Sequence, residues 1–167
     1  MNLCNRLTTL TLTSISLVVG FLPLSSTPAQ AQDDVYIDRD CRHVPNSVIQ
    51  KLSDPPWFHY QNIFYSRKFT ANGKPYWLYV ARYTDGAAMF CVSQPDFKQA
   101  RLISTSEISG QFIEKVEQNS NQSSMFIVRV IQGQNTGAPF VDYRLDLSNP
   151  DRPVITFVRG GCCVDFD

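Results

Sequence analysis

Alternating hydrophobic and polar positions make the stretch from Ile63 to Ser93 the most strongly patterned part of the chain. It contains three apolar runs, which are separated by Asn72-Gly73 and by Asp85-Gly86. Asn-Gly and Asp-Gly tolerate positive φ at both central turn positions, so they favour the type I′ turns whose twist matches that of a hairpin. The pattern therefore predicts a meander of three antiparallel strands.

Counting outward from each turn predicts how the three strands pair. With Asn72-Gly73 as the central turn residues, Phe69 faces Tyr76, and the same rule at the second turn places Val80 opposite Cys91. Successive side chains of a strand point to opposite faces of a sheet. Both faces of this meander are strongly apolar. We therefore expect a sheet that is covered on both sides, or a barrel whose outer surface is covered by other segments of the chain.

Shorter patterns on the C-terminal side predict further strands, at residues 101–103, 111–117, 125–131, 140–147 and 154–158. The run 125–131 is apolar except for Arg129, which indicates a central strand covered on both faces. In 140–147 the apolar residues alternate with Asp142 and Arg144, which is typical of a half-buried antiparallel strand. We therefore predict an all-β fold, an antiparallel meander of about eight strands that forms a small barrel or a packed sheet.

One short helix is predicted, from Asn46 to Leu52. Asn46 suits the N-cap, Val48 and Ile49 share a face with Leu52, and Pro55 disfavours helical backbone at the residue before it. We assign residues 32–60 to an N-terminal arm that carries this helix and residues 61–167 to the antiparallel β domain.

Residues 1–31 have the pattern of a cleaved signal peptide. Arg6 precedes a long apolar and hydroxyl-rich run, and Pro28-Ala29-Gln30-Ala31 contains the small-x-small pattern of a cleavage site. A membrane-anchoring helix is the weaker alternative, because the run is rich in Thr and Ser. No later apolar run reaches the ~20 residues of a spanning helix. We expect a secreted or periplasmic protein with no membrane span after cleavage.

The charge balance gives no sign of a nucleic-acid or anionic-membrane partner. The chain has 15 basic and 15 acidic residues, and the predicted cleavage removes Arg6 and no acid. A near-neutral domain without a cluster of Lys and Arg argues against binding to nucleic acid or to an anionic membrane.

Four cysteines follow the predicted cleavage site: Cys41, Cys91, Cys162 and Cys163. An even number in an exported chain indicates two disulfides. Adjacent cysteines do not reach ordinary disulfide geometry without distortion. We therefore expect one of Cys162 and Cys163 to bond to Cys41 and the other to Cys91. The alternative is a strained bridge between the adjacent pair, which would be redox-active.

The chain contains none of the sequence motifs for a nucleophile elbow, a zinc protease, a phosphate-binding glycine loop or a dithiol redox site. Cys41 and His43 supply only two possible metal ligands. We therefore expect no enzyme activity, cofactor or metal site. An enzyme would need a site centred on His59, with acids brought from distant strands.

Aromatic residues are the main candidates for binding: Trp57, His59, Trp77, Tyr79 and Tyr83. Aromatic side chains with a polar group suit the recognition of sugars, rings and peptides, although most such residues in sheets serve cross-strand packing. The leading hypothesis is a non-enzymatic domain that binds a small ligand or a protein through an aromatic-lined sheet face. The alternative is an envelope-associated structural or inhibitor-like protein that acts through loop 119–124 or loop 132–137.

Two arginines on the more aliphatic face of the predicted meander need an explanation. By the predicted register, Arg67 and Arg82 both lie on that face. We expect them either to reach a sheet edge or to pair with acids such as Glu114 or Asp142.

Overall fold

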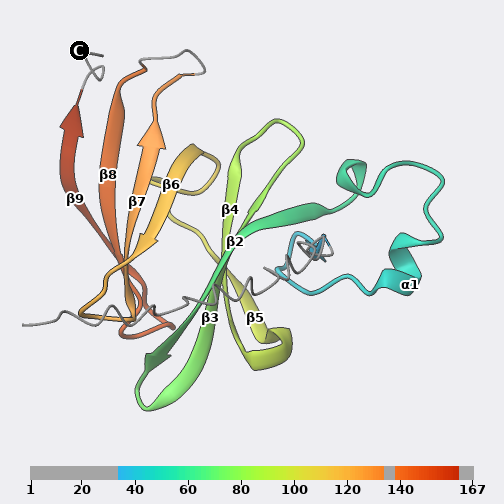
Figure 1. Ribbon diagram of the computed structural model, residues 1–167, viewed down its shortest axis with the longest axis horizontal. Helices are drawn as coiled ribbons and strands as arrows, with labels where there is room; N and C mark the ends of the chain where they lie inside the picture. Colours follow the sequence, from blue (N-terminus) through green and yellow to red (C-terminus); the bar gives the residue numbers. More distant parts are fainter. Residues whose placement is uncertain (1–33, 134–137, 162–167) are drawn as a thin grey trace, which may run out of the picture. The chain divides into compact units, whose positions relative to one another are not determined.

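The computed structural model describes residues 34–133 and 138–161. The predicted signal peptide, residues 1–31, lies outside them. Nine antiparallel strands form two sheets within the described residues (Figure 1). The first sheet has the order β1-β2-β3-β4-β5 and the second has the order β6-β7-β8-β9. The predicted all-β antiparallel fold is confirmed, as two curled sheets.

The strands of the first sheet are β1 (Tyr36–Ile37), β2 (Gln61–Ala71), β3 (Lys74–Arg82), β4 (Ala88–Gln94) and β5 (Lys98–Ile103). Those of the second sheet are β6 (Phe112–Gln118), β7 (Met125–Ile131), β8 (Phe140–Asp146) and β9 (Val154–Gly161). Helical turns are confined to the short helix α1 (Asn46–Ile49) and the 3-10 turns η1 (Pro56–Phe58) and η2 (Pro95–Phe97) in the described part. None of these helices is long and apolar enough to cross a membrane.

The β2–β3 hairpin has the register that the Asn-Gly turn predicts. Phe69 pairs with Tyr76, and the turn residues Asn72 and Gly73 have φ values of 51° and 70°. Positive φ at both positions is the requirement that Asn-Gly meets at low cost. The predicted pairing ends at a bulge one residue beyond Tyr65, where the strand register shifts.

The β3–β4 turn differs from the prediction by one residue. Val80 pairs with Phe90, not with Cys91. The reason is that Asp85-Gly86 does not form a two-residue turn: Tyr83 donates its N–H to the Ala87 carbonyl, and Gly86, at φ 89°, occupies the left-handed position of a longer bulged loop. A slip of one residue exchanges the two faces of a strand. Cys91 therefore lies on the opposite face from Val80.

The inner faces of the two sheets pack together into the main core. Its fully buried large side chains come from both sheets and from the segment between them: Leu78, Val80, Phe90, Val92, Ile103, Ile108, Phe126, Leu145 and Leu147. Phe69 of β2 meets Phe126 of β7 edge to face, with the ring centroids 5.8 Å apart. Burial of this apolar surface is the main favourable contribution to the packing of the two sheets.

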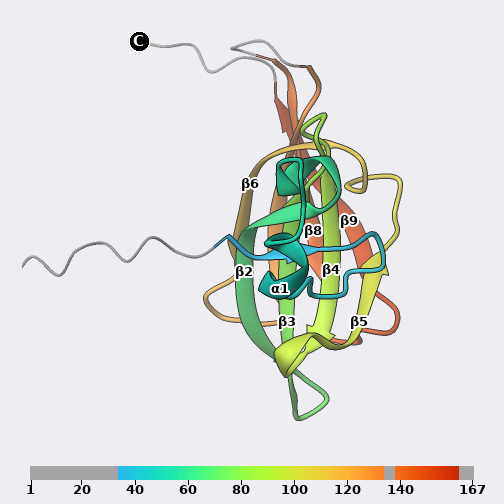
Figure 2. The same cartoon turned by 90° about the vertical axis from the view of Figure 1, so that its right-hand side faces the viewer.

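The N-terminal arm covers the outer face of the first sheet, where β1 and α1 lie in front of β2–β5 (Figure 2). The strand β1 also pairs with β2, so the arm contributes to this sheet. A second buried cluster forms beneath it, made of Ile37, Cys41, Tyr79, Ala81, Met89 and Cys91. The first sheet is therefore covered on both faces, as its two apolar faces require.

Cys41 and Cys91 form a disulfide with each other, with their Cα atoms 5.8 Å apart. The prediction that each would bond to Cys162 or Cys163 was wrong. The unfavourable geometry of a bond between adjacent cysteines does not exclude a bond between Cys41 and Cys91, which lie together in the cluster beneath the arm. Cys162 and Cys163 lie outside the described residues.

The helix is shorter than predicted, and its first residue was misplaced. It ends at Ile49, and Pro45 rather than Asn46 is the N-cap, with extended backbone at φ −63° and ψ 144°. Asn46 is already helical, and no side chain caps the first turn. The extended ψ of Pro45 places this residue outside the helix, because its φ alone is also compatible with helical backbone.

Removal of the disulfide should destabilise the domain strongly, because it closes a loop with a sequence separation of 50 residues. For Cys41→Ala combined with Cys91→Ala we expect a loss of about 4 kcal/mol of unfolding free energy in the chain-entropy model. Urea unfolding of the wild type under reducing conditions is the matched comparison. A loss below about 1 kcal/mol in both experiments would contradict this role for the disulfide.

The two turn glycines should differ in their tolerance of alanine. A Cβ at Gly86 would lie 3.2 Å from Cε1 of Phe112, whereas a Cβ at Gly73 meets no atom within 4 Å. Both positions have positive φ, so Gly73→Ala should cost about 1 kcal/mol and Gly86→Ala about 2 kcal/mol or more. Urea unfolding measures the loss of unfolding free energy in each variant. Equal losses would show that the Phe112 side chain moves aside without an energetic penalty.

Candidate functional site

Tyr79, one of the predicted binding residues, lies in the interior. Its side chain is 1% exposed, and its hydroxyl donates a hydrogen bond to the Cys41 carbonyl at 2.8 Å. Burial raises the pKa of Tyr79 to about 12. Tyr79 thus joins the sheet to the arm and does not line an open surface.

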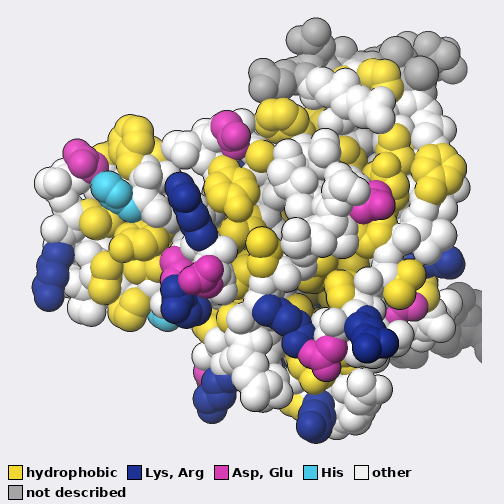
Figure 3. All heavy atoms as spheres, turned by 180° about the vertical axis from the view of Figure 1, so that it is seen from behind, with side chains coloured by type: hydrophobic (Ala, Val, Ile, Leu, Met, Phe, Trp, Pro, Cys, Tyr) yellow, Lys and Arg dark blue, Asp and Glu magenta, His cyan; other side chains and the backbone are white. Residues whose placement is uncertain are grey.

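The other four predicted binding residues are spread over different parts of the domain. Tyr83 is half-buried, and its hydroxyl lies 3.3 Å from Sδ of Met89. Trp57 is 54% exposed in the turn η1, and its neighbour Phe58 is 65% exposed. Hydrophobic side chains also reach the surface on the face of the molecule shown in Figure 3. Close to Trp57 in the chain, His59 has Nε2 3.8 Å from Oδ2 of Asp54, and both side chains are largely exposed. Among the described residues, no second acidic side chain forms an ion pair with His59.

Trp77 is the predicted aromatic that lines a hollow. An open hollow of about 440 Å³ is lined by Ser66, Arg67, Lys68 and Trp77. Lys68 is the cross-strand neighbour of Trp77, and its Nζ lies 5.5 Å from the indole centroid. The other side of the indole meets Phe97 edge to face at 5.7 Å. The ring is therefore held between a cation and an aromatic edge while part of it remains at the surface.

Arg67 and Arg82 do not pair with the acids proposed for them. Both are exposed, and each guanidinium lies over a ring of its own sheet: Arg67 is 5.4 Å from Tyr65, and Arg82 is 4.2 Å from Phe64. Cation–π contacts of this kind keep the charges at the surface. Of the two acids, Asp142 forms its ion pairs within the second sheet instead.

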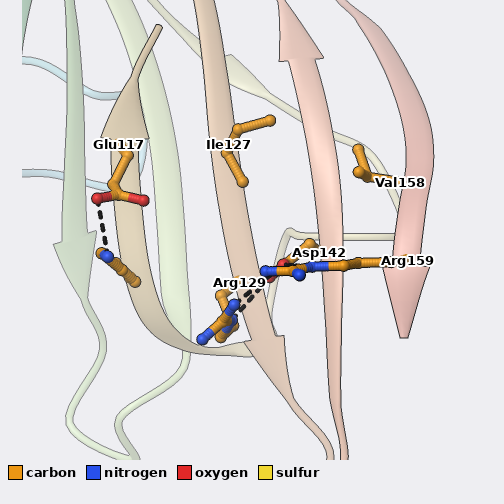
Figure 4. A pocket seen from close by; sticks show the side chains of 7 residues that line it. Glu117, Ile127, Arg129, Asp142, Val158 and Arg159 are labelled. Carbon is orange, nitrogen blue, oxygen red and sulfur yellow. Dashed lines mark hydrogen bonds and ion pairs between the residues drawn. The ribbon is translucent and has the colours of Figure 1, made fainter. Parts of the chain in front are cut away.

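A second hollow, which the sequence reasoning missed, lies on the outer face of the second sheet. It has a volume of about 390 Å³ and spans all four strands (Figure 4). Its lining residues are Lys115, Glu117, Ile127, Arg129, Asp142, Val158 and Arg159. Asp142 lies between the two arginines on neighbouring strands, and its side chain is only 4% exposed.

Three hydrogen bonds hold the Asp142 carboxylate. Arg129 donates from Nε to Oδ1 at 2.7 Å and from Nη2 to Oδ2 at 3.0 Å, and Arg159 donates from Nε to Oδ2 at 2.8 Å. The bonds from Arg129 are the largest cause that lowers the pKa of Asp142, and those from Arg159 add to it. Asp142 also raises the pKa of Arg129. Asp142 and Arg129 therefore stabilise each other's charged form.

Part of this ion-pair cluster was visible in the sequence. Arg129 was the single charge in an apolar run, and Asp142 was expected to point outward, as it does. What was missing is the β7–β8–β9 register that sets Arg129 opposite Asp142 and Asp142 opposite Arg159. Strand pairs joined by long loops carry no turn signal from which that register can be counted.

The described residues offer no evident metal site. No three side chains of His, Cys, Asp or Glu lie grouped as ligands within residues 34–133 and 138–161. Cys41, considered as a ligand together with His43, is in the disulfide. His43 stacks on Phe97 instead, with the centroids 4.9 Å apart.

Comparison with known proteins gives no relationship from which a function could be transferred. No protein family, curated protein or solved structure was found to match this chain. The functional argument therefore depends on the two hollows and their chemistry.

The ion pairs of Asp142 should make the domain sensitive to acid. Because the pKa of folded Asp142 is lowered, its stabilising contribution is present above the unfolded pKa of about 3.9 and is lost as the pH falls through the folded value. At pH 7, Asp142→Asn should lose about 3 kcal/mol of unfolding free energy, since it leaves two arginines without their anion.

Urea unfolding at pH 7 and at pH 3 measures this effect. The difference in unfolding free energy between the wild type and Asp142→Asn should be smaller at pH 3 than at pH 7. Glu114→Gln is the control, because Glu114 is 54% exposed and its Oε2 lies 3.9 Å from Nε of Arg129. If this difference in unfolding free energy is the same at both pH values, the ion pairs of Asp142 do not stabilise the fold as proposed.

Proposed function

We propose that this protein is an exported, non-enzymatic binding domain that recognises an acidic sugar or oligosaccharide through Trp77. The observation that carries the proposal is the hollow in which a partly exposed indole lies beside Lys68, Arg67 and Ser66. Export is supported by the N-terminal signal pattern and by the buried disulfide, which forms and persists in oxidising compartments.

The chemistry of the hollow suits a ring that carries a negative charge. An indole face offers an apolar platform for the C–H face of a sugar ring. Lys68 and Arg67 can donate to a carboxylate beside that ring, and Ser66 can donate to or accept from a sugar hydroxyl. Both cations are exposed, so a ligand can reach them without displacing an internal ion pair.

The position of Trp77 in the sheet makes it a rigid contact residue. It sits in β3, paired with Lys68 on one side and with Ser93 on the other. Phe97 holds the ring edge to face. A side chain fixed in this way loses little conformational entropy when it binds a ligand.

The loop hypothesis has weaker support. Loop 119–124 is closed by its own hydrogen bonds, because Asn119 Oδ1 accepts from the N–H groups of Asn121 and Gln122. Gln118 Nε2 also donates to Ser123 O at 2.7 Å. Residues 134–137 of the other loop lie outside the described residues. A structural or inhibitor-like role through these loops stays a prediction.

The two tryptophans of the chain, Trp57 and Trp77, allow a direct test by fluorescence. In Trp57→Phe, Trp77 is the sole indole, and its emission should change when tetragalacturonate, an acidic oligosaccharide, is added. In Trp77→Phe the remaining indole should not respond. Lys68→Gln should weaken binding by roughly fivefold, or about 1 kcal/mol.

Two comparisons make the test specific. The neutral maltotetraose should produce no change in the emission of Trp57→Phe. Lys98→Gln, an exposed lysine outside the hollow, should leave the affinity for tetragalacturonate unchanged. The proposal is wrong if Trp77 does not respond to the acidic oligosaccharide, or if the neutral one binds equally well.

A further inference from the structure

The outer face of the second sheet carries a second hollow, on a surface separate from Trp77. The two sheets meet through their inner faces, so their outer faces point away from each other. Trp77 belongs to the outer face of the first sheet, and Arg129, Asp142 and Arg159 belong to that of the second. Any activity of this hollow is therefore independent of the proposed function.

The arginines in this hollow are fixed in place before any ligand arrives. Asp142 accepts from Nε of both guanidiniums, at 2.7 Å and 2.8 Å. The ring of Phe140 lies 4.2 Å from the guanidinium carbon of Arg129 and 5.9 Å from that of Arg159. A carboxylate and an aromatic ring thus hold the two side chains, which lowers the entropy cost of using them to bind an anion.

Both guanidiniums retain donors that Asp142 does not use. An arginine has five N–H groups, of which Asp142 takes two from Arg129 and one from Arg159. Within residues 34–133 and 138–161, no hydrogen bond involves Nη1 of Arg129 or either terminal nitrogen of Arg159. The contact of Glu114 with Arg129 is at Nε, at 3.9 Å, where the proton is already donated to Asp142.

The residues that line the hollow carry an excess of positive charge. Lys115 and Glu117 form an ion pair at 2.8 Å. Among the lining residues, Asp142 is the single anion that pairs with the two arginines, so the lining carries three positive and two negative charges. Glu114, which does not line the hollow, adds a negative charge 3.9 Å from Nε of Arg129, and the local excess therefore favours at most one monovalent anion.

The hollow also has an apolar part. Ile127 and Val158 line it beside the arginines, and Val158 is 47% exposed. At about 390 Å³, the hollow lies in the lower part of the ~300–1,000 Å³ range of small-molecule sites. Paired N–H donors match a carboxylate in geometry as well as in charge.

We propose that this hollow binds a small organic acid with one carboxylate and one apolar group. The carboxylate accepts from the free N–H groups of Arg129 and Arg159, and the apolar group covers Ile127 and Val158. A ligand with two negative charges fits less well, because Glu117 and Asp142 lie in the same hollow.

Phenylacetate is the probe, and NMR of the full mature chain is the measurement. The arginine Nε–H resonances of Arg129 and Arg159 should shift on titration, together with the amides of β7 to β9, with a dissociation constant on the order of 1 mM. Acetate, which lacks the apolar group, and phenylacetamide, which lacks the charge, should each bind at least about fivefold more weakly.

Arg159→Gln should weaken phenylacetate binding by roughly fivefold or more. The matched control is Arg144→Gln. Arg144 is exposed and lies on the same face of β8 as Asp142, but it does not line the hollow. This control substitution should leave binding unchanged. Arg129 is not substituted, because it donates two of the three hydrogen bonds to buried Asp142 and its loss would threaten the fold.

Val158→Glu tests the site without removing an arginine, since it places a carboxylate inside the hollow and should abolish phenylacetate binding. Urea unfolding confirms that each variant is folded.

The proposal is overturned if phenylacetamide binds as well as phenylacetate, if Arg159→Gln and Arg144→Gln behave alike, or if the shifts map away from β7 to β9. The response of Trp77 to tetragalacturonate should be unchanged in Arg159→Gln, so failure of one proposal is distinguishable from failure of the other.

Discussion

The first sheet is apolar on both faces, and a sheet of this kind is stable in water only when something covers each face. The second sheet covers one face through contacts such as Phe69 with Phe126. The N-terminal arm covers the other, although its regular structure in the described residues is limited to a two-residue strand, a four-residue helix and the three-residue turn η1. An arm with so little regular structure is held against the sheet only weakly by its own secondary structure. The disulfide between Cys41 and Cys91 and the hydrogen bond from Tyr79 supply the missing attachment.

This requirement decides which aromatic residues remain for binding. Tyr79 faces the arm and is used to hold it, so the centre of the aromatic face becomes interior. Trp77 lies in the same strand but nearer to the β2–β3 turn, where Lys68 rather than the arm lies over its ring. The aromatic face predicted from the sequence thus divides into a buried anchor and a partly open hollow. Only the second can bind a ligand in this conformation.

How much could be predicted from the sequence differed between the two turns of the meander. Asn72-Gly73 behaved as its composition predicts, so the pairing of Phe69 with Tyr76 followed by counting. Asp85-Gly86 has nearly the same composition but forms a longer bulged loop, since only Gly86 takes the left-handed conformation there. Composition alone does not distinguish the two loops. The resulting slip of one residue moved Cys91 to the face that the arm covers, where it meets Cys41.

Arg129, Asp142 and Arg159 show the same dependence on register in the second sheet. The sequence pattern placed Arg129 in a strand covered on both faces and Asp142 on the polar face of a half-buried strand. Only the pairing of β7, β8 and β9 brings these two residues together with Arg159. Once paired, the three residues stabilise the fold, and the same geometry leaves the outer N–H groups of the arginines directed toward a ligand. Asp142 is almost fully buried because two guanidiniums cover it, and those guanidiniums are fixed because Asp142 holds them. A carboxylate that binds their outer N–H groups would add a second anion without breaking the first set of bonds. Binding there should therefore stabilise the second sheet, because the ligand would bind the folded state and not the unfolded chain.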